Sequence, residues 1–147
     1  MKIAQPERLS RLRIQHEFEM LEEMKRCSLP VPSFGNEPLS DNEGIFGYRM
    51  ELLSPIDFTN LSAVSEDLEA IMNSVHNCGF SHGGLNTSNV MRNRSGSLVL
   101  IDPSFSGRLG RQKPDHVPSS QYEGTVSCTT TDQRYLEMFF GCTTGTL

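Results

Sequence analysis

The chain has 147 residues, 36 % of them hydrophobic, and a formal net charge of -5 at pH 7. This length is enough for one domain with a single core, and the acidic balance argues against a nucleic-acid partner, because phosphate backbones are bound by basic surfaces. The first residues are polar and charged, unlike a signal peptide, and no apolar run approaches the roughly 18 residues of a membrane span. We therefore expect a cytoplasmic protein without a membrane partner.

The four cysteines, Cys27, Cys78, Cys128 and Cys142, are widely spaced, and no C-x-x-C pair occurs. Histidines at metal-ligand spacing are also absent from their neighbourhoods. The pattern is typical of free thiols in a reducing compartment, and disulfide bonds are the less favoured alternative.

In chain order, residues 1–4 (MKIA) predict a short strand. Apolar residues then recur with the 3.6-residue period of an amphipathic helix over residues 9–27, with Ser10 as its expected N-cap. The sequence Leu-Pro-Val-Pro at 29–32 ends this helix, because proline cannot continue it. Residues 35–44 are predicted to form a polar turn, and residues 45–53 a strand in which Phe46, Tyr48 and Met50 share one face.

The second half of the chain begins with a predicted linker at residues 54–57. An apolar stripe predicts a helix over residues 61–78, with Gly79 as its C-terminal cap. Residues 106–127 are predicted to form a loop, whose basic residues Arg108, Arg111 and Lys113 could dock an acidic partner, although a solvated loop is the favoured interpretation. A last helix is predicted over residues 132–140, so the fold class is α+β.

The most informative stretch is residues 80–105, FSHGGLNTSNVMRNRSGSLVLIDPSF. A loop of small and amide residues at 82–89 precedes two short apolar runs, and the turn 93–96 joins these runs into a predicted hairpin. The hairpin should bring Asn89, at the entry of one strand, close to Asp102, at the exit of the other. An amide and a carboxylate oxygen are ligands that Mg²⁺ accepts together with substrate phosphates.

This stretch resembles the catalytic centre of protein kinases, which reads H-x-D-x-x-x-x-N, a hairpin, and then D-F-G. His82, Asn89 and Asp102 stand at the matching positions. The His-Gly start of the loop and the Asp-Pro-Ser sequence at 102–104 are similar to compact phage and bacterial serine/threonine kinases. The resemblance implies that Asn89 and Asp102 hold Mg²⁺ and that His82 is a scaffold residue beneath the loop.

The resemblance extends weakly along most of the chain. Lys2 and Glu17 are placed like the Lys–Glu ion pair that fixes the α- and β-phosphates of ATP, although a solvated lysine near the chain end is the favoured alternative. The stretch 17–34 looks like kinase helix C and its exit. Glu51 and Leu53 would lie in the hinge whose backbone binds adenine, and an ordinary strand is the alternative there.

The implied fold is one protein-kinase-like domain, 1–147. Residues 1–53 would form a reduced N-lobe of helix C and a small antiparallel sheet. Residues 54–147 would form a truncated, mainly helical C-lobe that carries the catalytic-loop hairpin, with Asp132 placed like the aspartate that opens the next C-lobe helix. The glycine-rich phosphate loop and the lower half of the C-lobe are not expected within this sequence.

One departure decides the expected activity. Gly84 occupies the position of the catalytic Asp, and the neighbouring Asn86 is not basic. General acid–base groups contribute about 10²–10⁴-fold to catalysis, so the sequence predicts a pseudokinase that acts by binding another protein, with at most weak Mg-ATP binding. The alternative is an active minimal serine/threonine kinase of the phage or injected-effector type, completed by a partner in the host-cell cytoplasm; a third possibility is a protein without nucleotide function.

Overall fold

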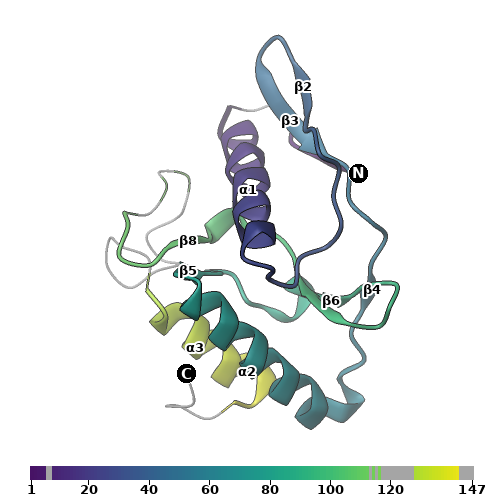
Figure 1. Cartoon of the computed structure of the whole chain (residues 1–147), viewed down its shortest axis with the longest axis vertical. Coiled ribbons are helices and arrows are strands. Elements are labelled where there is room, and N and C mark those ends of the chain that lie inside the picture. The colour runs from purple at the N-terminus through teal and green to yellow at the C-terminus, as the bar shows by residue number, and fades with distance from the viewer. Residues whose placement is uncertain (6–7, 113, 115, 117–127, 143–147) are drawn as a thin grey trace.

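Three α-helices and three small antiparallel sheets form the part of the chain that the structure describes (Figure 1). The structure is a computed structural model, and it describes residues 1–5, 8–112, 114, 116 and 128–142. The α+β class predicted from the sequence is confirmed at this level.

Helix α1, Arg8–Arg26, is the predicted amphipathic helix. Its buried side chains include Ile14, Phe18 and Leu21, which follow the 3.6-residue period. Ser10 lies inside the helix rather than at its N-cap. The helix ends before Ser28, which has a positive φ of 58°, and the Leu29 N–H donates to the Met24 carbonyl at 3.0 Å to close the last turn.

The first sheet has the order β1-β3-β2, with β1 at Lys2–Ile3, β2 at Leu39–Asp41 and β3 at Gly44–Tyr48. The short amino-terminal strand is confirmed, but two predictions were wrong. The polar turn 35–44 contains β2, because Asp41 accepts a hydrogen bond from the Glu43 N–H at 2.9 Å and folds the chain back into a hairpin. The strand expected to continue to residue 53 ends at Tyr48, and beyond it Met50 forms only an isolated bridge with Phe34.

The second sheet has the order β4-β6-β7, with β4 at Ser54–Pro55, β6 at Val90–Arg92 and β7 at Leu98–Leu100. The predicted hairpin β6–β7 is confirmed, with Val90 opposite Leu100. The linker prediction for residues 54–57 was incomplete, because Ser54 pairs with Arg92 at the edge of this sheet. A proline is compatible with an edge strand, which need not donate every ladder hydrogen bond.

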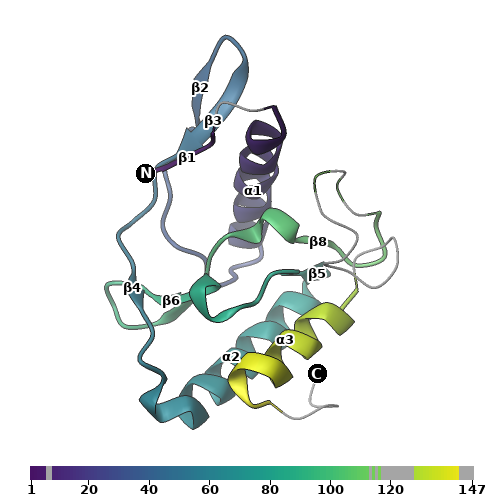
Figure 2. The same cartoon turned by 180° about the vertical axis from the view of Figure 1, so that it is seen from behind.

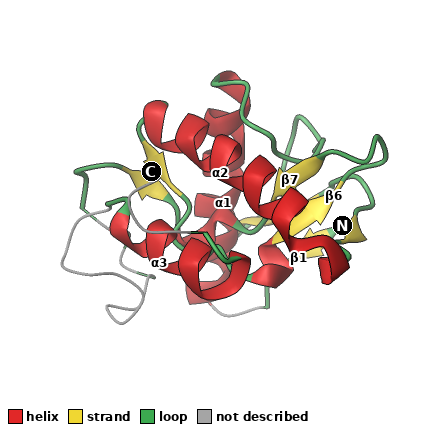
Figure 3. Ribbon diagram, turned by 90° about the horizontal axis from the view of Figure 1, so that it is seen from below, coloured by secondary structure: helices red, strands yellow, loops and turns green. Residues whose placement is uncertain are grey.

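Helix α2, Leu61–Asn77, and helix α3, Thr130–Phe140, agree with the predicted helices within two residues. They run side by side at one end of the molecule, whereas α1 and the β2–β3 hairpin form the other end (Figures 1 and 2). A two-stranded sheet, β5 at Phe80–Ser81 with β8 at Gly107–Arg108, follows α2. The view from below shows β6 and β7 beside α2 (Figure 3).

The buried apolar residues form two clusters, and α1 contributes to both. The smaller cluster joins Ile14, Phe18 and Leu21 of α1 to Tyr48 of β3. The larger cluster joins Met20 and Met24 of α1 to the buried faces of α2, α3 and the β6–β7 hairpin. Helix α1 therefore connects the two ends of the molecule, and the face it turns toward residues 103–105 is fixed by packing on both sides.

All four cysteine thiols are free in the structure. Among the described residues, no helix combines the length and the apolar character that crossing a membrane would demand.

Candidate functional site

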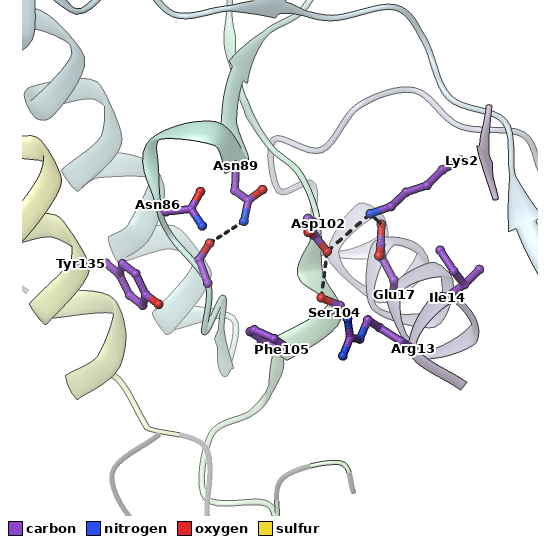
Figure 4. A pocket seen from close by; sticks show the side chains of 11 residues that line it. Lys2, Arg13, Ile14, Glu17, Asn86, Asn89, Asp102, Ser104, Phe105 and Tyr135 are labelled. Carbon is purple, nitrogen blue, oxygen red and sulfur yellow. Dashed lines mark hydrogen bonds and ion pairs between the residues drawn. The ribbon is translucent and has the colours of Figure 1, made fainter. Parts of the chain in front are cut away.

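A cavity of about 330 Å³ lies between α1 and the loop 82–89 (Figure 4). Its lining comes from segments that are far apart in the sequence, and it includes most of the candidate site residues. The lining residues are Lys2, Arg13, Ile14, Glu17, Gly84, Asn86, Asn89, Asp102, Ser104, Phe105 and Tyr135.

One side of the cavity, which we call the charged wall, consists of Lys2, Arg13 and Glu17. The Lys2 Nζ lies 2.6 Å from Glu17 Oε1, so a carboxylate holds its ammonium group, and 35 % of the lysine side chain is exposed. The register of the first sheet explains this position, because Lys2 lies opposite Tyr48 on β3. The Tyr48 hydroxyl donates to the same Glu17 oxygen, so strand and helix meet at one buried carboxylate.

Burial governs the protonation of this wall. Glu17 is only 1 % exposed, and burial raises the pKa of its carboxyl above the ordinary value, opposed by the attraction of Lys2 and reinforced by the negative charge of Asp102. Burial and the charge of Glu17 also raise the pKa of Tyr48, which therefore remains a hydrogen-bond donor. The charged wall thus holds an ion pair whose strength depends on pH.

Asp102 lies between the two sides of the cavity, at the end of strand β7. Its backbone has a positive φ of 54°, an uncommon conformation for a residue other than glycine. Its Oδ1 lies 3.5 Å from Lys2 Nζ and accepts a hydrogen bond from the Ser104 hydroxyl at 2.8 Å. Burial alone would raise the pKa of this carboxyl, but Lys2 and Ser104 outweigh it and the pKa is lowered. Asp102 is therefore a carboxylate at neutral pH.

The opposite side, which we call the loop wall, consists of Gly84, Asn86 and Asn89. The Asn89 side-chain nitrogen donates to the Gly84 carbonyl at 2.7 Å, and Asn89 is one of the residues that line the cavity. The Ile101 N–H donates to the Asn89 carbonyl at 2.9 Å, which holds residue 89 beside the strand end that carries Asp102. The structure thus brings Asn89 and Asp102 to the same cavity.

The oxygen atoms of Asn89 and Asp102 are chemically suited to Mg²⁺, which prefers hard oxygen ligands. No group of three or more His, Cys, Asp or Glu side chains that could hold a metal ion occurs within the described residues. A divalent cation at this position would need further oxygens from a ligand, and Mg²⁺ commonly takes them from phosphate groups.

Asn86 and His82 are structural in the geometry observed. The Asn86 side chain accepts hydrogen bonds from the Ser88 N–H at 3.0 Å and the Ser88 hydroxyl at 2.6 Å, which caps the turn 87–89. His82 is fully buried, and its Nε2 donates to the Ile101 carbonyl at 2.8 Å while its Nδ1 accepts from the Gly84 N–H at 3.3 Å. Its ring therefore ties the loop wall to the strand end beside it.

Asp132 of α3 holds the start of the loop 82–89, which carries the loop wall. Its carboxylate is fully buried and accepts hydrogen bonds from the N–H groups of His82 at 2.9 Å and Gly83 at 2.8 Å. The same carboxylate lies 2.9 Å from the ring of His76. Two backbone donors and one imidazole thus fix the position from which the loop starts.

Gly84 lies in the loop wall without a side chain, at the position predicted to have lost a catalytic aspartate. A Cβ atom built on Gly84 would meet Phe105 at 3.5 Å and the Asn89 side-chain nitrogen at 3.8 Å, both ordinary contact distances. Packing therefore does not require a glycine here, and a side chain would enter the cavity.

Glu51 and Leu53, the predicted adenine-binding residues, do not line this cavity. The Glu51 N–H donates to the Ser33 carbonyl at 2.8 Å, so this donor already has a partner. In the predicted basic cluster, Arg108 pairs with Glu23 at 3.2 Å and lies over the Phe80 ring, whereas Lys113 lies outside the described residues.

Sequence reasoning did not identify Arg13, Tyr48, Ser104, Phe105 and Tyr135 as site residues. Arg13 precedes Glu17 by four residues and therefore shares its helix face, which is a pattern that the sequence does contain. Tyr48 was interpreted only as a core residue, and nothing local shows that its hydroxyl reaches α1.

A scan against protein-family models gives no match for this chain, and a search of the curated proteins finds no similar sequence. The functional interpretation therefore rests on the residues and their geometry.

Proposed function

We propose that the protein is a kinase-like nucleotide-binding protein, a pseudokinase that acts by binding another protein and takes Mg-ATP weakly in the cavity between the charged wall and the loop wall. The observation that carries the proposal is the meeting of Lys2, Glu17 and Asp102 at one cavity, with distances of 2.6 Å and 3.5 Å from the Lys2 nitrogen to the two carboxylates. These residues come from a strand, a helix and a hairpin end. Kinases use a lysine, a helix glutamate and a metal-binding aspartate in this combination.

The loop wall supports the same proposal. A buried histidine and a buried aspartate hold the loop, and its asparagine faces the cavity together with Asp102. Bound Mg²⁺ would neutralise phosphate charge, and Asn89 and Asp102 would hold it. Lys2 would orient the phosphates, because Glu17 fixes its ammonium group.

Gly84 is the reason for proposing binding rather than efficient catalysis. Neither Gly84 nor Asn86 can accept the proton of an attacking hydroxyl at neutral pH, and the Asn86 oxygen is already engaged with Ser88. The chain would then influence a partner protein through the difference between its nucleotide-bound and nucleotide-free states.

Titration calorimetry with ATP in the presence and absence of Mg²⁺ tests nucleotide binding. We expect Mg²⁺-dependent binding to the wild type, its loss in Asp102→Asn, and its retention in Asp67→Asn, which removes the same charge from an exposed position on α2. Asparagine is the appropriate replacement at residue 102 because it tolerates positive φ. Equal binding by both variants, or no binding by the wild type, would contradict the proposal.

An active minimal serine/threonine kinase remains the second candidate, and one observation favours it. The Lys2–Glu17 pair is already formed, and an intact pair of this kind is required for phosphoryl transfer in kinases. Radiolabel transfer from ATP to the chain or to a basic protein, abolished by Asp102→Asn, would establish this candidate in place of the first. Absence of transfer from the wild type, with transfer appearing in Gly84→Asp, would establish that the missing base limits activity.

A further inference from the structure

Within the described part of the chain, acidic side chains engage Lys2 but not Arg13, the other cation of the charged wall. Its ammonium group lies within 3.5 Å of both Glu17 and Asp102. Arg13 forms no ion pair with any described residue, and its buried Nε has no hydrogen-bond partner among them. A buried, unsatisfied guanidinium nitrogen is costly, so the cavity contains a cation that has no anionic partner among the residues that the structure describes.

The contacts of Arg13 leave its guanidinium group available to bind a ligand in the cavity. Its guanidinium carbon lies 5.8 Å from the centre of the Phe105 ring, so an aromatic face supports it and leaves its charge uncompensated. Figure 4 shows the guanidinium group beside Ser104 and Phe105 at the cavity. Arginine presents a planar fork of donors that matches the oxygens of a phosphate group.

The spacing of the two cations indicates the class of anion. The Lys2 ammonium group lies beside Glu17 and Asp102, whereas the Arg13 guanidinium group lies beside Ser104 and Phe105 (Figure 4). A linear chain of phosphates carries charge at several points, whereas a single phosphate concentrates it at one. Two cations separated along the cavity therefore favour a polyphosphate over a monophosphate.

We propose that Arg13 is a binding residue for the terminal phosphate of a polyphosphate ligand, with Lys2 holding the phosphates nearer to Glu17. This inference rests on the proposed function, because it assigns the cavity to the same nucleotide. It goes further by naming a residue that discriminates a nucleoside triphosphate from shorter phosphates. Inorganic tripolyphosphate shares the chemistry without the nucleoside, so it separates the anion site from nucleotide recognition.

The test is calorimetric titration of the wild type, Arg13→Gln and Arg8→Gln with ATP, ADP and tripolyphosphate, each with Mg²⁺. Arg8 is the matched control, because it is an exposed arginine on the same helix and does not line this cavity. We expect Arg13→Gln to weaken ATP and tripolyphosphate binding about tenfold or more, the scale of a charge-assisted hydrogen bond, and to weaken ADP binding less. Arg8→Gln should bind as the wild type does.

Each outcome separates the two proposals. Binding of ATP by the wild type with no difference between Arg13→Gln and Arg8→Gln overturns the role of Arg13 and leaves nucleotide binding intact. Arg13-dependent binding of tripolyphosphate without binding of ATP supports the anion site and contradicts the proposed function. Failure of the wild type to bind either ligand contradicts both. Arg13→Lys, which keeps the charge but not the fork, should recover part of the lost affinity, and equal melting temperatures of the variants exclude a folding defect.

Discussion

The two walls of the cavity differ in what they carry. The charged wall has two cations and a buried carboxylate, and Lys2, Glu17 and Tyr48 are joined by short contacts. The loop wall has a glycine and two amides, although His82 and Asp132 hold its backbone firmly. The loop is therefore held firmly in place, although none of the three loop-wall residues has an ionisable side chain. The comparison teaches that a cavity can have the cationic groups suited to bind an anionic ligand without having a general base that would activate a nucleophile. The charged wall has such cations, and the loop wall has no such base.

The largest expected effect comes from removing the support of the loop wall. Asp132→Ala should lower the free energy of unfolding by about 3–5 kcal/mol, because it leaves two buried backbone donors and a part-buried imidazole without their acceptor. Urea unfolding followed by circular dichroism measures this loss. His76→Gln is the control: it removes one contact and keeps both backbone bonds, so it should cost only about 1 kcal/mol. Equal losses in the two variants would show that Asp132 does not hold the loop.

The next effect concerns the charged wall. A Cβ atom on Gly47 would overlap the Lys2 carbonyl oxygen, which belongs to the paired backbone of β1. Gly47→Ala should therefore destabilise the fold by about 1–3 kcal/mol and displace Lys2 from Glu17. Urea unfolding together with the nuclear magnetic resonance shift of the Glu17 carboxyl carbon measures both consequences. An unchanged carboxyl shift would mean that β1 does not need Gly47 to position Lys2.

The third effect is the pH dependence that the charged wall contributes. Because the folded state raises the pKa of Glu17 above 4.5, it binds that proton more tightly than the unfolded chain does. The stability of the wild type relative to Glu17→Gln should therefore be greatest at low pH and should decrease as the pH rises from about 4.5 through the raised pKa. Asp102 acts in a different window, because its lowered pKa removes stability only as the pH falls below 3.8. Unfolding titrations between pH 4 and pH 8 measure the difference, and parallel curves for the two proteins would contradict the assignment.

The smallest expected effect on stability is that of a substitution at Gly84 in the loop wall. Gly84 has no positive φ, and a Cβ atom there meets its neighbours at ordinary distances. Gly84→Ala should leave stability unchanged or raise it by up to about 1 kcal/mol through a less flexible unfolded chain. Thermal unfolding of Gly84→Ala and Gly47→Ala, measured side by side, compares the need for glycine in the loop wall with the need for glycine beside the charged wall. A loss above 1 kcal/mol in Gly84→Ala would show that the loop requires glycine for packing.

The elements that could be predicted from the sequence are those with a strong local pattern. The apolar period of α1 and α2 and the turn between two apolar runs at β6–β7 each specify their own element. The strands β2 and β4 could not be predicted, because two or three residues with mixed polarity carry no period, and their pairing is decided by β3 and β6. Tertiary contacts therefore fixed what the local pattern left open.

The candidate site follows the same division. Asn89 and Asp102 could be placed together because a hairpin joins them within one short stretch. The pairing of Lys2 with Glu17 was considered only through a resemblance, and it depends on the register of Lys2 with Tyr48 across strands that are distant in the sequence. Glu51 and Leu53, which the sequence predicts as hinge residues, lie beyond the end of β3 at Tyr48 and are not among the residues that line the cavity.

The central claim is that Asn89 and Asp102 share a divalent cation beneath a nucleotide. Replacing Mg²⁺ by Mn²⁺, which is paramagnetic and accepts the same oxygen ligands, and recording the side-chain amide resonances with ATP tests this most directly. We expect strong broadening of the Asn89 side-chain amide resonance in the wild type. In Asp102→Asn this resonance should stay sharp. An Asn89 amide that stays sharp while Mn²⁺ and ATP are bound, or one that broadens equally in Asp102→Asn, would contradict it.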